Sequence, residues 1–268
     1  MSAELQAQRF ERKYFVSQRQ ALRIRDYVCT YLVPDEYSLK FGADLSYPVH
    51  SLYLDSDQLA TYWATVHSEK TRFKLRIRYY DDDPESPVFF EIKRRVGDCI
   101  LKQRGAVRRN AAPLIVSGYL PEPDHLISSK ASHLGALQKF SQLMQMLAAR
   151  PKMHIAYERE AWVSREGNSV RVTLDKSVRG EPRREPIFVT EMERPVYPFR
   201  EGVHDQIVLE IKFTNRFPDW LADMVRHFNL VASGAPKYCG SIALSGEEKV
   251  GERGPGEAQR GGDVLRYY

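Results

Sequence analysis

At least six segments of the chain alternate charged and apolar residues with the period of a β-strand. In the segment KLRIRYY, Lys74 to Tyr80, Leu75 and Ile77 fall on one face of an extended chain while Arg76 and Arg78 fall on the other. The same alternation occurs in ERKYF, FFEIKRR, CILKQRG, YEREAW, VRVTLDK and VLEIKFT. A chain of this kind can fold only into an architecture that gives each strand one apolar and one charged environment.

These segments and the turn residues between them predict a strand-rich protein. Nine strands are expected, at residues 9–16, 49–54, 73–80, 88–94, 99–107, 155–163, 169–175, 186–193 and 207–213. Amphipathic spacing predicts four helices, at residues 17–32, 56–66, 134–149 and 218–230, and Ser17 with Gln20 gives the first of them a capping box. Many strands, few helices and short connections favour the α+β class with a largely antiparallel sheet.

The composition is that of a globular protein with a sizeable core. Hydrophobic residues occupy 43% of the 268 positions, and we assign residues 1–245 to one domain and residues 246–268, rich in Gly, Glu and Arg, to a disordered tail. Three widely separated cysteines argue against a disulfide framework or a zinc site. No segment has the length and apolar character of a signal peptide or a membrane span, so we expect a cytoplasmic protein.

The charged strand faces permit two arrangements. They can meet solvent around an apolar interior, or they can line the inside of a barrel whose apolar faces are covered by helices. Lysines and arginines placed two residues apart, together with four amphipathic helices that need apolar surface to cover, favour the second arrangement. Such an interior needs a polyanion to offset its cations, and Arg and Lys are suited to phosphate oxygens.

The partner that this pattern predicts is a phosphate chain and not a nucleic acid. Nucleic-acid surfaces interleave basic residues with exposed aromatic side chains, whereas the basic residues here alternate with aliphatic ones that need burial. Glutamates within the basic strands are expected to hold a divalent cation, Mn²⁺ or Mg²⁺, between protein and phosphate. Glu210 is the first candidate, followed by Glu11 and Glu91; the alternative is that each pairs with neighbouring Lys and Arg side chains.

Nine motifs in order resemble a known family. They are ERKYF, HSLYLDS, KLRIRYY, FEIKRR, LKQR, YERE, VRVTLD, VLEIKF and PKYC, from about Arg9 to Ser241. Together they resemble the VTC domain, the catalytic domain of the vacuolar transporter chaperone polyphosphate polymerases, in the triphosphate tunnel metalloenzyme superfamily. The resemblance implies an antiparallel eight-stranded β-barrel tunnel with a charged lumen, flanked by amphipathic helices, and a Mn²⁺ or Mg²⁺ site.

The resemblance also implies site residues. The expected substrate-binding residues are Lys13, Arg76, Arg78, Lys93, Lys102, Arg159, Arg171, Lys212 and Lys237. Glu210 resembles the main metal ligand, and Pro236 departs from the serine that the family commonly carries before its lysine. Tyr14, Tyr53 and Tyr80 are expected at packing or rim positions, and no role is assigned to His50, His67 or His154.

The expected activity is transfer of the terminal phosphate of ATP to a polyphosphate chain. Arg76, Arg78, Arg159 and Arg171 would hold the β- and γ-phosphates, and Glu210 would hold the metal. One alternative is a tripolyphosphatase or nucleoside triphosphatase on the same fold, with water as acceptor and Glu11 or Glu91 as base. Another is a protein that binds polyphosphate without catalysis.

Overall fold

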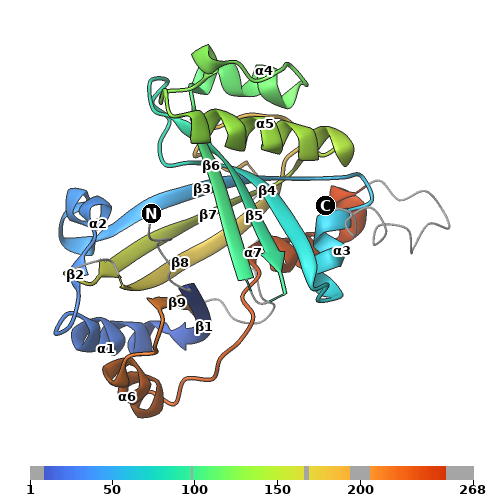
Figure 1. Cartoon of the computed structure of the whole chain (residues 1–268). Coiled ribbons are helices and arrows are strands. Elements are labelled where there is room, and N and C mark those ends of the chain that lie inside the picture. Colours follow the sequence, from blue (N-terminus) through green and yellow to red (C-terminus); the bar gives the residue numbers. More distant parts are fainter. Residues whose placement is uncertain (1–8, 98, 166–168, 194–205, 252–268) are drawn as a thin grey trace, which may run out of the picture. The chain divides into compact units, whose positions relative to one another are not determined.

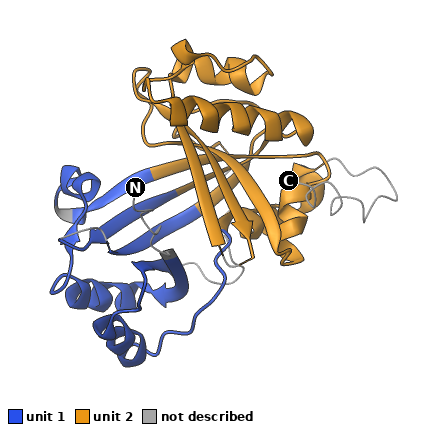
Figure 2. Ribbon diagram, in the orientation of Figure 1, with its two compact units in different colours: residues 1–48, 157–178, 202–236 blue, residues 49–156, 179–201, 237–268 orange. Residues whose placement is uncertain are grey.

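The computed structural model describes residues 9–97, 99–165, 169–193 and 206–251 (Figure 1). The chain divides into two compact units (Figure 2). Unit 1 comprises residues 1–48, 157–178 and 202–236, and unit 2 comprises residues 49–156, 179–201 and 237–268. Strands β7 (Arg150–Val163) and β8 (Val170–Pro182) each contribute residues to both units.

The sheet confirms the α+β class and the antiparallel pairing expected from the sequence. Its strand order is β1-β9-β8-β7-β3-β4-β5-β6, with β2 paired to β7. The remaining strands are β1 (Arg9–Ser17), β2 (Val33–Pro34), β3 (Ser46–Asp55), β4 (Thr71–Tyr79), β5 (Val88–Val96), β6 (Cys99–Val107) and β9 (Gln206–Thr214). The path begins at β1 and ends at β6, and no pairing of these two strands closes it within the residues that the structure describes.

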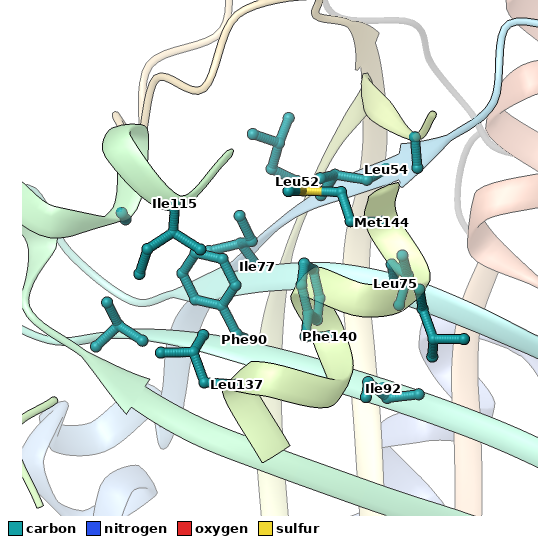
Figure 3. Close-up of a cluster of buried hydrophobic side chains, with 14 of the residues drawn as sticks. Leu52, Leu54, Leu75, Ile77, Phe90, Ile92, Ile115, Leu137, Phe140 and Met144 are labelled. Atoms are coloured by element: carbon teal, nitrogen blue, oxygen red, sulfur yellow. The ribbon is translucent and has the colours of Figure 1, made fainter. Parts of the chain in front are cut away.

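In unit 2, helices cover the apolar face of β3 to β6. Helix α3 (Ala60–Val66), helix α4 (Ala112–Val116) and helix α5 (Ala131–Met146) contribute to one hydrophobic cluster with these strands (Figure 3). The rings of Phe90 on β5 and Phe140 on α5 meet edge to face, with their centroids 4.9 Å apart. Each fully buried aliphatic or aromatic side chain in such a cluster stabilises the fold by about 1.5–3 kcal/mol.

In unit 1, two helices cover the apolar face of β1, β8 and β9. Helix α1 (Gln18–Val28) buries Ile24, and helix α6 (Asp219–His227) buries Leu221, in a second hydrophobic cluster. The predicted capping box is confirmed, because the Gln20 amide donates to Ser17 Oγ and the Ser17 amide donates to Gln20 Oε1. In both units the apolar strand faces therefore lie under helices, as the second arrangement predicts.

One predicted strand is wrong. Residues 186–193 form no strand and are held instead by side chains and by packing. The Tyr79 hydroxyl donates to the Val189 carbonyl at 2.8 Å, the Thr190 amide donates to Asp82 Oδ1 at 2.6 Å, and the Phe188 ring packs against Tyr79. The alternating pattern of this segment therefore reflects a single buried anchor, Phe188, and not pairing in the sheet.

Several short elements were not predicted. They are helix α2 (Glu36–Lys40), helix α4, helix α7 (Lys237–Ser245), helix α8 (Glu247–Val250), strand β2 and the 3-10 helices Gly42–Asp44, Arg109–Ala111 and Pro123–His125. Helix α8 lies beyond the domain boundary expected at residue 245, and Val250 is buried. The rest of the predicted tail, residues 252–268, lies outside the described residues. Among the described helices, none has the length and apolar character needed to span a membrane.

Candidate functional site

The charged face of β4, β5 and β6, here called the basic face of unit 2, is laid out in three rows across the strands. The strand register aligns Arg78 with Phe89 and Ala106, Arg76 with Glu91 and Arg104, and Lys74 with Lys93 and Lys102. Ser51 and Tyr53 of β3 extend the first two rows. These positions share a face because successive side chains of a strand point to opposite sides.

Glu91 lies at the centre of the basic face and is almost wholly buried, with 1% of its side chain exposed. Arg76 Nε donates to Glu91 Oε2 at 2.8 Å, and Lys102 Nζ lies 2.7 Å from Oε1. Arg104 Nε lies 3.4 Å from the same oxygen. Burial alone would raise the pKa of Glu91, but the charges of Arg76, Arg78 and Lys102 hold it well below its usual range.

Cations outnumber carboxylates on this face. Over the three rows, six lysine and arginine side chains accompany the single carboxylate of Glu91; the six are Lys74, Arg76, Arg78, Lys93, Lys102 and Arg104. Glu91 is ionised and already in contact with several of them. The face therefore carries an excess of positive charge that a bound anion can offset.

The pKa values of two groups are lowered on this face, that of Tyr53 by the cations and that of Lys102 first by desolvation. Burial alone would raise the pKa of the Tyr53 hydroxyl, but the nearby charges of Arg76, Arg78 and Lys74 lower it to about 8. Desolvation lowers the pKa of Lys102 to about 8, with further lowering by Arg76 and Arg78, although Glu91 opposes the change. Both shifts favour the state with less positive charge, as expected where cations are crowded.

Neighbouring side chains fix the arginines of the basic face. Arg76 Nη1 donates to the Tyr53 hydroxyl at 3.2 Å, and Arg78 Nε donates to Ser51 Oγ at 3.3 Å. Arg78 is 7% exposed. Both guanidinium groups therefore have limited freedom, which lowers the entropy lost when an anion binds.

Lys237, a predicted phosphate ligand, lies next to the basic face of unit 2, because the residue that follows it packs against that face. It is the first residue of α7, and Tyr238 follows it. The Tyr238 ring stacks on Tyr53 at 4.8 Å, and its hydroxyl donates to the buried Asp55 at 2.8 Å. The first turn of α7 is thereby tied to the end of β3, and Pro236 ends the segment that leads into it.

The remaining predicted residues lie in unit 1, on the charged face of β1, β7, β8 and β9, here called the mixed face. The register places Lys13 opposite Glu210 and Glu11 opposite Lys212. Lys13 Nζ lies 2.9 Å from Glu11, and Lys212 Nζ lies 3.0 Å from Glu210. Cations and carboxylates alternate across these strands, so this face is close to balanced in charge, unlike the basic face of unit 2.

Two arginines of the mixed face are held by carboxylates. Arg159 binds Asp175 with both Nε and Nη2, at 2.7 and 2.8 Å, and also lies 3.7 Å from Glu210. Arg171 donates to Asp35 Oδ2 at 2.5 Å, and the other oxygen of Asp35 caps α2. Burial would lower the pKa of Arg159, but Asp175 raises it well above its ordinary value, so this guanidinium keeps its charge.

The lysines of the mixed face differ in how firmly they hold their protons. Burial would lower the pKa of Lys13, but Glu210 and Glu11 raise it above its ordinary value. Burial lowers the pKa of Lys212, and the attraction of Glu210 and Glu11 does not fully offset this because Arg159 adds repulsion. Lys212 is therefore the more easily deprotonated of the two.

The carboxylates differ in their suitability for a divalent metal. Within the described residues, no group of three or more His, Cys, Asp or Glu side chains is placed to hold a metal ion. Mg²⁺ is commonly bound by one or two carboxylates together with substrate phosphates and water. Both oxygens of Glu210, Glu11 and Glu91 face Lys or Arg side chains, but Glu210 and Glu11 lie within 4.0 Å of the same Lys212 and are 7% and 14% exposed, whereas Glu91 is 1% exposed.

Some residues that shape these faces were not assigned a role from the sequence. Tyr53 was expected at a packing or rim position, but its hydroxyl contacts Arg76. The signal available in the sequence was the spacing of Ser51 and Tyr53, which lie two residues apart and therefore share one face of the strand. Asp175 was placed on the charged face without a role, and it holds Arg159. Asp35 lies in a turn and gave no sequence signal for its contact with Arg171.

Comparison with known proteins identifies the family. The chain matches a family model described as the VTC domain over residues 8–245, and no curated protein sequence matches it. Among solved structures, it is similar to a putative adenylate cyclase from Bacillus halodurans, with a TM-score of 0.47 and 14% identity over 85% of this chain and 94% of that chain. It is also similar to the PH1819 protein from Pyrococcus horikoshii OT3, with a TM-score of 0.42 and 12% identity over 88% of this chain and 96% of that chain. Likeness at this level supports no argument about activity, but the family match spans most of the sequence, and the chain therefore belongs to the VTC domain family.

Proposed function

We propose that the protein is a metal-dependent phosphotransferase that moves the terminal phosphate of ATP onto a polyphosphate chain. The observation that carries this proposal is the charge imbalance of the basic face of unit 2, where six cations accompany one carboxylate. A phosphate chain carries the repeated negative charge that such a face needs. Membership of the VTC domain family supports the same function.

In unit 2, the proposed phosphate ligands are Arg76, Arg78, Lys93, Lys102 and Lys237. The guanidinium groups can bind phosphate oxygens in pairs, while the lysines supply point charges along the chain. Because Tyr53 and Ser51 hold the arginines, the phosphate is aligned by groups that are already in place. Glu91 acts here as the counter-ion that allows this many cations to gather.

In unit 1, the proposed phosphate ligands are Lys13, Arg159, Arg171 and Lys212, and the proposed metal ligands are Glu210 and Glu11. A bound Mn²⁺ or Mg²⁺ would supply Lewis-acid polarisation and charge neutralisation. Arg159 keeps its charge and its orientation because Asp175 binds it through two hydrogen bonds. Within unit 1, Arg159 and Arg171 are the arginines that we propose stabilise phosphoryl charge, and within unit 2 Arg76 and Arg78 have the same proposed role.

The surroundings of Glu91 argue against a triphosphatase that uses this residue as its base. Hydrolysis would need a base to activate water, and Glu91 is a poor one because its pKa lies well below the usual range. A terminal phosphate of a polymer is ionised near neutral pH and needs little help. This observation favours the polymerase over a triphosphatase with Glu91 as base.

Product analysis tests the proposal. Purified protein is incubated with ATP and Mn²⁺, polyphosphate is resolved on a gel, and ADP and free phosphate are counted separately. ADP with a lengthening polymer supports the polymerase, and ADP with equimolar free phosphate identifies a hydrolase. If neither ATP nor inorganic triphosphate is turned over but polyphosphate binds, the protein is a binder and the enzymatic proposal is wrong.

A further inference from the structure

Arg104 and Phe89 form a flat stacked pair at one end of the basic face of unit 2. The guanidinium carbon of Arg104 lies 3.5 Å from the centroid of the Phe89 ring. At this separation the two planar groups lie face to face, because a tilted guanidinium would clash with the ring. The Phe89 and Tyr80 rings meet edge to face, with centroids 5.9 Å apart and an interplanar angle of 70°.

The register explains how these side chains meet. Phe89 belongs to the row of Arg78, and Arg104 belongs to the next row, opposite Glu91. Arg104 therefore leans diagonally over Phe89, which is within reach for a long side chain on a sheet. Glu91 Oε1 lies 3.4 Å from Arg104 Nε, so the guanidinium is held from below by the ring and from the side by a carboxylate.

Arg104 differs from the other cations of this face in what it offers a ligand. Its Nε is buried without a hydrogen-bond partner of good geometry, and the guanidinium plane covers an aromatic ring. Nevertheless, 37% of its side chain is exposed. A guanidinium held flat on one side and open on the other is a stacking surface for a planar aromatic group, because nucleobases stack readily on arginine planes.

We infer that the Arg104–Phe89 pair is the nucleobase platform of the basic face and gives the protein its preference for a nucleoside triphosphate over inorganic triphosphate. The base stacks on the open side of the Arg104 guanidinium. The triphosphate then runs across β5 towards Arg76 and Arg78, which lie on β4, two strands away from Arg104 at about 5 Å per strand. This inference rests on the proposed function, since it assigns the base end of the same donor.

Binding measurements with two ligands separate the base from the phosphates. The dissociation constants of ATP and inorganic triphosphate are measured by calorimetry for the wild type, Arg104→Lys and Phe89→Leu, with metal withheld so that no turnover occurs. Arg104→Lys keeps the charge but loses the plane, and Phe89→Leu keeps an apolar side chain but loses the ring. Tyr119→Leu, which removes an exposed aromatic ring elsewhere in unit 2, is the matched control.

The wild type is expected to bind ATP more tightly than inorganic triphosphate, after allowing for the difference in ligand charge. In both variants the dissociation constant of ATP should rise by about tenfold, while that of inorganic triphosphate should change by less than about twofold. Equal losses for both ligands, or unchanged ATP binding, would overturn the platform while leaving the phosphate site intact. If the wild type binds neither ATP nor inorganic triphosphate, the proposed function is wrong and this inference is wrong with it. Thermal unfolding of each variant checks that the fold is retained.

Discussion

Replacing Glu91 with glutamine separates the two roles that a buried carboxylate in an anion site can have. If Glu91 is a counter-ion, its removal weakens the fold but strengthens anion binding, because the cations it held become available to the ligand. Breaking a buried, hydrogen-bonded ion pair costs about 3–5 kcal/mol of unfolding free energy. The lower part of that range is expected here, since Lys102 and Arg104 are partly exposed and solvent can relax around them.

The gain in affinity follows from the contact distances. Glu91 lies 2.6 Å from Arg76 Nη2 and 2.7 Å from Lys102 Nζ. A phosphate oxygen on the far side of the same cation therefore lies about 5–6 Å from the carboxylate. At an effective dielectric constant of about 20, two unit charges at that separation repel by about 3 kcal/mol. After allowance for screening, the affinity for inorganic triphosphate should rise by about tenfold to a hundredfold at low salt.

Urea denaturation and calorimetry measure the two effects on the same protein. Glu85→Gln, which removes an exposed carboxylate in unit 2, is the matched control and should change neither quantity appreciably. The expected result for Glu91→Gln is lower stability with tighter anion binding, and partial recovery of stability when triphosphate is present. Lower stability together with weaker triphosphate binding would refute the reasoning and identify Glu91 as a residue that the ligand itself needs.

Four further predictions follow from the packing and the charges. Anion binding should weaken between about pH 7 and about pH 9, because a bound polyanion favours the charged form of Lys102, whose pKa is lowered to about 8. Calorimetry with Lys102→Met should show a smaller dependence, and Lys102→Met with Tyr53→Phe should show none, because the Tyr53 hydroxyl also ionises near pH 8. The tyrosinate absorbance should titrate near pH 8 in the wild type and lose that component in Tyr53→Phe. Arg159→Lys, which keeps the charge but loses the two-pronged contact with the buried Asp175, should lower turnover by about tenfold to a hundredfold and also lower the melting temperature. Ile77→Ala, in the fully buried core of unit 2, should lower the unfolding free energy by about 2–5 kcal/mol in a denaturant titration.

The alternation of single strands was enough to predict which faces would be apolar. In β4, Leu75 and Ile77 fall into the core of unit 2 while Arg76 and Arg78 fall on the charged face, because the period of two leaves no other choice once one residue is placed. The need of amphipathic helices for apolar surface correctly indicated where α1 and α5 would pack. These inferences depend only on local periodicity and burial.

Pairings between distant strands could not be predicted in the same way. Arg171 donates to Asp35 across 136 residues of sequence, and neither segment contains a signal for this contact. Tyr238 reaches Asp55 across 183 residues of sequence. The charge balance of the mixed face likewise depends on strand order, since Glu11 lies opposite Lys212 only because β1 pairs with β9, at the other end of the chain.

The most direct test of the central claim is the affinity of the protein for polyphosphate when charge is removed from the basic face of unit 2. Lys74→Gln with Lys93→Gln removes two cations of one row without removing a contact recorded for Glu91, and Lys70→Gln with Lys130→Gln removes the same charge from exposed positions of the same unit. The account predicts at least a tenfold loss of affinity for the first pair and less than about a twofold change for the second. Equal losses for the two pairs would mean that polyphosphate responds only to net charge, and the basic face would not be its binding site.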